Sequence, residues 1–284
     1  MSVWRRTGRG ALWPLAVLWR TVFAEPYREA QAECRAFDRT AEADRFDRDL
    51  FVTLLVCALS LSLIHYTTPS ALIEWLSALG LHGPAAWLHS ELAETEARSL
   101  PRLAFWASVS VFGYVLVPVL AIRLLMRRRV VDFGLRVRGI WRHAWIYGLM
   151  FAVMLPVVWI MSAEESFAAT YPFLRLEEEE PLWPRFWIWQ AMYAAQFLAL
   201  EFFFRGFLVH GLRRRFGYYA VFVMVVPYCM IHFGKPMPET LGAILAGLIL
   251  GSLSLKTRSI WFGAALHVAV ALAMDLSVLA RHHS

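Results

Sequence analysis

Seven apolar stretches, each long enough to cross a lipid bilayer, constrain this chain more than any other feature. A transmembrane helix needs about 20 mostly apolar residues. The seven stretches are Leu50–Thr67, Leu103–Leu125, Ala144–Ala163, Phe186–Leu212, Gly217–Phe233, Thr240–Leu255 and Ile260–Ala280. An eighth stretch, Ala71–His89, is interrupted by Glu74 and by Gly80, Gly83 and Pro84, and is either a re-entrant or interfacial segment or a weak span. We therefore expect an all-α, polytopic transmembrane helical bundle with about seven or eight spans.

The composition supports a lipid environment. Apolar residues make up 59% of the chain and charged residues 18%, whereas soluble domains average roughly half and a quarter. The net charge of +6 comes from short basic blocks between apolar stretches, which is typical of membrane loops and argues against a nucleic-acid partner. The three cysteines, Cys34, Cys57 and Cys229, have no metal-ligand spacing and predict neither a disulfide framework nor a zinc ribbon.

The distribution of arginine and lysine predicts the orientation. Basic residues are concentrated after the second, fourth and sixth apolar stretches, while the alternate loops are acidic or nearly neutral. The positive-inside rule then places the N-terminus in the cytoplasm. The segment Ala11–Phe23 follows Arg5, Arg6 and Arg9 and predicts an amphipathic helix on the membrane surface. We divide the chain into a cytoplasmic N-terminal arm (1–49), N-terminal transmembrane helices and loops (50–180) and a C-terminal transmembrane core (181–284).

Four polar side chains inside the C-terminal apolar stretches are candidates for chemistry. Glu201 and Arg205 stand at positions i and i+4, so on a helix they face the same side and can form an ion pair. His232 and His267 each lie alone in another apolar stretch. An isolated ion pair can simply order a bundle, and a single buried histidine is more often structural than catalytic. Ionisable residues on three separate spans, however, favour a functional site.

These residues carry a resemblance to a known family. The run Glu201-Phe-Phe-Phe-Arg205-Gly206, the aromatic-xxx-His pattern that ends at His232, and Gly247-Leu-Ile-Leu-Gly251 followed by Trp261 and His267 occur in the same order as in CPBP proteins. This is the CAAX-protease and bacteriocin-processing family of intramembrane peptidases. The resemblance covers about residues 185–280. It implies an intramembrane endopeptidase in the inner membrane of a bacterium that acts on a membrane-anchored or lipidated protein, and the form Leu200-Glu201-Phe-Phe-Phe-Arg205-Gly206 is similar to sortase-like branches of the myxosortase type.

The resemblance also implies a role for each residue. Glu201 would activate water, His232 would assist it, His267 would stabilise the oxyanion, and Arg205 would hold the glutamate. Two positions depart from the family pattern: Leu200 replaces the first of two adjacent glutamates, and Ala271 stands where the family often has asparagine. The chain contains no asparagine, and Asp275, one turn further, is the nearest polar candidate.

Alternatives to this reading concern the metal and the activity. The resemblance implies a metal-free glutamate mechanism without a cofactor, but Glu201, His232 and His267 could also form a His₂Glu zinc set, although they lack the HExxH spacing. The two departures favour a second hypothesis, a catalytically inactive membrane scaffold or immunity-type protein. A transporter would also place ionisable residues in the membrane, but it predicts an internal repeat that the sequence does not show.

Overall fold

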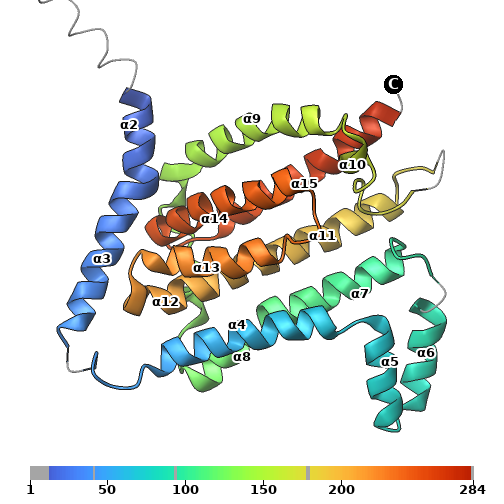
Figure 1. Ribbon diagram of the computed structural model, residues 1–284, viewed down its shortest axis with the longest axis horizontal. Coiled ribbons are helices and arrows are strands. Elements are labelled where there is room, and N and C mark those ends of the chain that lie inside the picture. Colours follow the sequence, from blue (N-terminus) through green and yellow to red (C-terminus); the bar gives the residue numbers. More distant parts are fainter. Residues whose placement is uncertain (1–12, 41, 93–94, 177–179, 283–284) are drawn as a thin grey trace, which may run out of the picture. The chain divides into compact units, whose positions relative to one another are not determined.

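All regular secondary structure in the described part of the chain is helical (Figure 1). The computed structural model describes residues 13–40, 42–92, 95–176 and 180–282. The candidate basic residues Arg5, Arg6 and Arg9 therefore lie outside the described residues. Within the described ranges, six helices are long and apolar enough to span a membrane. The predicted polytopic helical bundle is confirmed.

Six of the seven predicted spans correspond to these long helices. They run Arg48–Tyr66, Leu100–Leu125, Ile140–Met161, Arg185–Phe216, Met237–Thr257 and Trp261–Arg281. The prediction for Gly217–Phe233 is wrong in length, because helix α13 covers only Tyr219–Met230. Gly217 before it and Gly234 after it both have positive φ, a conformation that ends a helix readily at glycine. Twelve residues extend about 18 Å, short of the ~30 Å hydrocarbon core.

The interrupted stretch Ala71–His89 forms two short helices instead of a span. Helix α5 (Pro69–Ala78) and helix α6 (His82–Leu92) pack against each other as a hairpin. Gly80, with φ +76°, turns the chain between them. In Figure 1 the hairpin runs across the direction of the neighbouring helices α4 (Arg48–Tyr66) and α7 (Leu100–Val111). The segment is therefore not an eighth span, and its position fits the interfacial alternative.

The chain divides into two compact units, each assembled from separate segments. Unit 1 contains 1–53, 128–146 and 204–260, and unit 2 contains 54–127, 147–203 and 261–284. In unit 1, α13 packs closely on α14 (Met237–Thr257). A Cβ added to Gly251 would lie 2.8 Å from Val221 Cγ1, and one added to Gly247 would lie 3.0 Å from Val225 Cγ2. The two glycines, four residues apart, thus allow the two helices to approach closely.

The N-terminal arm of unit 1 is a continuous helical segment held by ion pairs. It consists of α2 (Trp13–Trp19), a π-helical turn η1 (Arg20–Ala24) and α3 (Glu25–Asp38). Figure 1 shows it crossing the ends of α12 (Val209–Phe216) and α14, which it contacts. Lys256, near the end of α14, pairs with Glu25 at 3.0 Å and with Glu29 at 2.5 Å.

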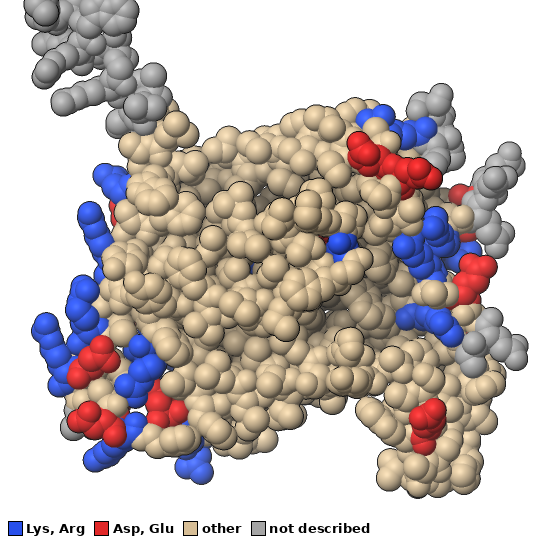
Figure 2. Space-filling model, viewed as in Figure 1, with Lys and Arg blue, Asp and Glu red and all other residues tan. Residues whose placement is uncertain are grey.

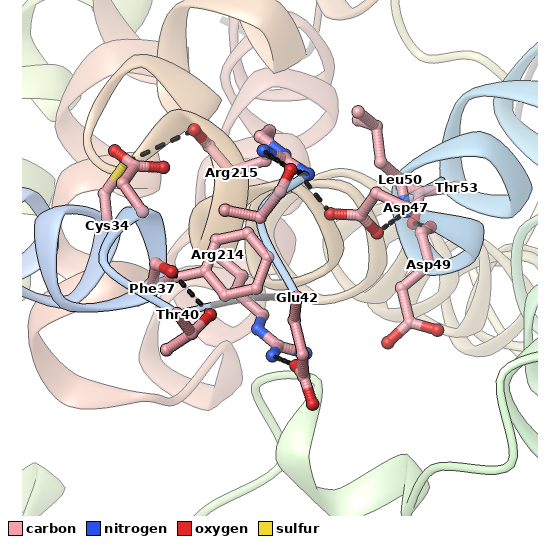
Figure 3. A network of polar contacts seen from close by, with 12 residues as sticks. Cys34, Phe37, Thr40, Glu42, Asp47, Asp49, Leu50, Thr53, Arg214 and Arg215 are labelled. Carbon is pink, nitrogen blue, oxygen red and sulfur yellow. Dashed lines mark hydrogen bonds and ion pairs between the residues drawn. The ribbon is translucent and has the colours of Figure 1, made fainter. Parts of the chain in front are cut away.

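The loop after α3 adds a second group of contacts, drawn in Figure 3. Arg215 of α12 donates to the carbonyl of Ala43 at 3.1 Å and pairs with Asp47 at 3.4 Å. The thiol of Cys34 donates to the carbonyl of Arg215 at 3.2 Å, and Arg214 pairs with Glu42. Figure 2 shows that charged side chains gather around α3 and this loop. The arm is therefore held within unit 1 by ion pairs and hydrogen bonds, together with buried residues such as Phe37.

Unit 2 contains the helices that carry half of the predicted site. Its central helix is α11 (Arg185–Glu201), which packs on α7 and on α15 (Trp261–His282). The helix that starts with α7 continues through a π-helical turn η2 (Phe112–Leu116), α8 (Val117–Leu120) and a second π-helical turn η3 (Ala121–Leu125). Helices α9 (Ala144–Met161) and α10 (Glu165–Ala168) precede α11 in the chain. The contact between α11 and α15 positions the candidate site.

Candidate active site

Glu201 and His267 form a direct pair inside unit 2. The Nδ1 atom of His267 lies 2.9 Å from Oε1 of Glu201. A carboxylate only accepts hydrogen bonds, so Nδ1 carries the proton that is donated. The Glu201 side chain is 1% exposed and that of His267 is 19% exposed. Access to the pair from outside the protein therefore lies on the imidazole side.

Two facing stripes of side chains bring this pair together. Trp189, Tyr193, Phe197 and Glu201 follow one another at intervals of four residues on α11, and so share one helix face. On α15 the corresponding stripe is His267, Ala271 and Asp275. The two helices pack against each other, with Glu201 meeting His267 at one end and Gln190 donating to Asp275 Oδ2 at 2.6 Å at the other. The order of these contacts shows that the two helices are antiparallel.

A stack of aromatic rings leads along the stripe to the imidazole of His267. The ring of Phe197 lies 4.5 Å from that of His267, centroid to centroid, at an interplanar angle of 26°. Tyr193 lies 4.4 Å from Phe197, and Trp189 lies 4.8 Å from Tyr193. Such contacts fix the plane of the imidazole, because rotation of the ring would break both the stack and the hydrogen bond to Glu201. Sequence reasoning missed this stack, although its four-residue spacing is visible in the chain.

Asp275 anchors the other end of the same helix pair. Its carboxylate is fully buried and accepts hydrogen bonds from the Gln190 side chain at 2.6 Å and from the backbone N–H of Phe173 at 3.2 Å. It therefore ties the segment around Phe173 to both α11 and α15. A buried carboxylate with two donors is a structural anchor, and the bonds to Gln190 and Phe173 are not contacts with Glu201 or His267.

Ala271 fills the position at which the resemblance suggests an asparagine. Its methyl group is buried in a cluster with Leu103, Leu174, Trp189 and Tyr193. The aromatic side chains of α11 thus pack directly on α15 at this level. The small side chain of Ala271 leaves room for the aromatic rings of α11. An asparagine at this position would be larger and would occupy part of that space.

Arg205 and His232 lie in unit 1 and share a neighbour, Tyr228. Arg205 is fully buried, and its guanidinium carbon lies 3.8 Å from the centroid of the Tyr228 ring, a cation–π contact. His232 contacts the same ring edge-on at 4.8 Å, and its Nδ1 lies 2.8 Å from the Tyr228 carbonyl oxygen. His232 lies in the turn after α13, which ends at Met230. Sequence reasoning noted only that an aromatic residue stands four positions before His232.

A π-helical turn separates Glu201 from Arg205 along the chain. Helix α11 ends at Glu201, and residues Phe202–Leu208 form the π-helical segment η6. A π-helix has i→i+5 hydrogen bonds and more residues per turn than an α-helix, and such turns are frequent at functional sites. The ion pair expected between Glu201 and Arg205 stays a prediction. The contact that the structure gives for Glu201 is its hydrogen bond with His267.

The candidate zinc set is not assembled as a group. Among the described residues, no three His, Cys, Asp or Glu side chains are placed to hold one metal ion. Glu201 and His267 form a carboxylate–imidazole pair, which can carry out proton transfer.

Comparison with known proteins supports this assignment of the segment. Residues 181–273 match the family described as type II CAAX prenyl endopeptidase Rce1-like. The match confirms the resemblance to CPBP peptidases over that segment, and the segment contains Glu201, Arg205, His232 and His267. No curated protein and no solved structure gives a significant match to the chain. The Rce1-like segment thus begins just before α11 and ends within α15.

Proposed function

We propose that this chain is an intramembrane endopeptidase that hydrolyses a peptide bond in a membrane-anchored or lipidated protein. The observation that carries the proposal is the buried pair of Glu201 and His267, 2.9 Å apart, inside the segment that matches an endopeptidase family. The six long apolar helices support a membrane-bound substrate, because the pair lies on two of them.

The pair is suited to the activation of water. The Glu201 carboxylate would take a proton from a water molecule as that water attacks the scissile carbonyl carbon. The tetrahedral intermediate would then collapse, with the proton passing from Glu201 to the leaving amine. His267, which donates to the same carboxylate, would orient it and assist these proton transfers. Because Glu201 is closed to solvent and His267 is not, the peptide would approach on the imidazole side.

This arrangement revises the roles expected for the two histidines. The sequence resemblance assigns the assisting role to His232 and the oxyanion to His267, but His267 is the direct partner of Glu201. We therefore propose that His267 is the assisting histidine. The participation of Arg205 and His232 stays a prediction, as do a metal-free mechanism, a myxosortase-type substrate, and a bacterial inner membrane with a cytoplasmic N-terminus.

Cleavage by purified protein in phospholipid nanodiscs tests the proposal. Two membrane-bound probes are suitable: a prenylated CAAX peptide and a peptide with an apolar C-terminal anchor. We expect the wild-type protein to cleave at least one, and Glu201→Gln to lower kcat by about 10²–10⁴-fold, the usual contribution of a general base. Glu239→Gln is the matched control, because Glu239 pairs with Lys235 on a partly exposed surface and should leave kcat unchanged.

The outcomes separate the two candidate functions. Equal cleavage by the wild type and Glu201→Gln would remove the assignment of the base. A folded wild-type protein that cleaves neither probe would favour the inactive scaffold or immunity-type protein. This alternative is also favoured by Leu200 and Ala271, which stand where the family pattern has glutamate and asparagine. Repeating the assay with a metal chelator tests the zinc alternative, because a metal-dependent enzyme would lose activity.

A further inference from the structure

A groove of about 670 Å³ lies in unit 1 between the N-terminal arm and the helices α13 and α14. Its wall is formed mainly by five aromatic side chains: Trp19, Phe23, Tyr27, Tyr218 and Phe222. The volume is within the ~300–1,000 Å³ range of small-molecule sites. The groove lies beside the arm that crosses the ends of α12 and α14 (Figure 1), and its lining residues belong to unit 1.

The aromatic wall is open to a ligand. Three of the rings that line the groove are exposed: Trp19 by 64%, Phe222 by 47% and Tyr27 by 44%. Trp and Tyr side chains are enriched where a membrane protein meets the lipid headgroups, because one end of the ring is apolar and the other polar. Leu248, from the middle of α14, contributes to the lining. The groove thus provides an apolar channel alongside a membrane helix.

One cation stands at this groove, and its acidic neighbours are neutralised. Arg28 is the arginine that lines it, and its side chain is exposed. Glu25 and Glu29 stand close to Arg28 in sequence, but both pair with Lys256, at 3.0 and 2.5 Å, and Glu25 also pairs with Arg20 at 3.3 Å. The two carboxylates are therefore balanced by two other cations. A net positive charge remains at the rim of an otherwise apolar groove.

We propose that this groove binds an anionic glycerophospholipid. The phosphate of the headgroup pairs with the Arg28 guanidinium, and an acyl chain lies along the five aromatic rings towards Leu248. Arginine suits a phosphate because its donors match two oxygens at once. A basic residue beside a membrane helix attracts anionic lipid from the cytoplasmic leaflet. This inference does not depend on proteolytic activity.

A second groove in the chain offers an internal comparison. It lies in unit 2, has a volume of about 490 Å³, and is lined by α7, η2, α8 and α11, with Phe112 and Met192 among its residues. None of the described side chains that line it is ionisable. It can therefore contact acyl chains but has no charge that selects a headgroup. Only the first groove should distinguish anionic from zwitterionic lipid.

Native mass spectrometry of the purified full chain measures this difference. The protein is released from nanodiscs that contain phosphatidylcholine and phosphatidylglycerol at 3:1, and retained lipids are counted. We expect the wild type to retain phosphatidylglycerol in excess of its share. Arg28→Gln should lower that preference about fivefold, in line with the attraction of one basic residue near an anionic surface. Phe222→Ala should lower the retention of both lipids at this site.

Two matched variants provide the controls. Arg35→Gln removes the same charge from the same face of α3, seven residues further on and away from the groove lining, and should leave the preference unchanged. Phe112→Ala alters the uncharged groove and should also leave it unchanged. Because Phe112 and Phe222 are both exposed, we expect the protein to tolerate their replacement by alanine. A thermal unfolding scan checks that each variant is folded.

Three results would overturn the proposal. The first is a wild type without any preference for the anionic lipid. The second is an equal loss in Arg28→Gln and Arg35→Gln, which would mean that only the net charge of the arm matters. The third is unchanged retention in Phe222→Ala, which would place the lipid elsewhere.

Discussion

Replacing His267 by alanine removes a hydrogen-bond partner of a carboxylate whose side chain is 1% exposed. Removing the partner of a buried charge typically costs about 3–5 kcal/mol, because the remaining charge stays desolvated. We expect a loss of that size in the free energy of unfolding for His267→Ala. Part of it, about 0.5–1.5 kcal/mol, comes from the lost stacking on Phe197.

The same change should be much milder when Glu201 is already neutral. Glu201→Gln keeps an oxygen that accepts the Nδ1 proton, so alone it should cost only about 1 kcal/mol. Adding His267→Ala to that variant removes one hydrogen bond to an uncharged amide and the stacking on Phe197, which together cost about 1–3 kcal/mol. The difference between the two backgrounds corresponds to a coupling energy of about 2 kcal/mol, within the range for residues in direct contact.

Reversible unfolding of the four proteins in a bilayer-like micelle measures this coupling. The pair of Lys235 and Glu239 is the control, because its contact of 2.6 Å is shorter than that of Glu201 and His267, but its side chains are 29% and 21% exposed. For such an i,i+4 surface pair we expect about 0.3–0.5 kcal/mol. A coupling below ~0.5 kcal/mol for Glu201 and His267 would refute the view that the protein stabilises a buried carboxylate through this imidazole.

Three further predictions concern the packing and the arm. Gly251→Ala should destabilise the protein by about 1–3 kcal/mol in a thermal or denaturant scan, because the added methyl group would meet Val221 at 2.8 Å; an unchanged stability would show that the two helices separate without cost. Asp275→Ala should remove two hydrogen bonds that hold the segment near residue 173, and limited proteolysis should then cut that segment faster than in the wild type. The pKa of Glu25 is lowered from its ordinary value of 4.5, chiefly by the hydrogen bond from Lys256. The stabilisation of arm docking by Glu25 is therefore complete above pH 4.5 and is lost as the pH falls through the lowered pKa. A spin label on the arm should become more mobile below about pH 4.5 in the wild type. The Glu25→Gln variant should show no such increase in mobility.

The sequence predicts most of the helical framework because apolar length is a local property. Six of the predicted spans need only a run of apolar residues, and each is found as a long helix. The stretch around α13 fails because Gly217 and Gly234 set its ends, and a hydropathy average does not register such turns. The hairpin of α5 and α6 is a similar case, since Gly80 reverses the chain within an apolar stretch.

The candidate site could be predicted as a set of residues but not as a set of contacts. Periodicity indicates which face of a helix carries Glu201 or His267, but not which helices are neighbours. The direct contact between these two therefore emerges only from the packing of α15 on α11. The expected ion pair of Glu201 with Arg205 stays a prediction. The π-helical segment Phe202–Leu208 has no sequence signal that we recognised.

Polar contacts fix the register of α11 and α15 at two points. Glu201 contacts His267 at one point and Gln190 contacts Asp275 at the other, and Ala271 packs against aromatic rings between them. A slide of α15 by one helical turn, about 5.4 Å, would break all of these contacts at once. These contacts therefore form or break together. A displacement of the segment near Phe173, which Asp275 holds, would shift α15 and so change the contact between Glu201 and His267.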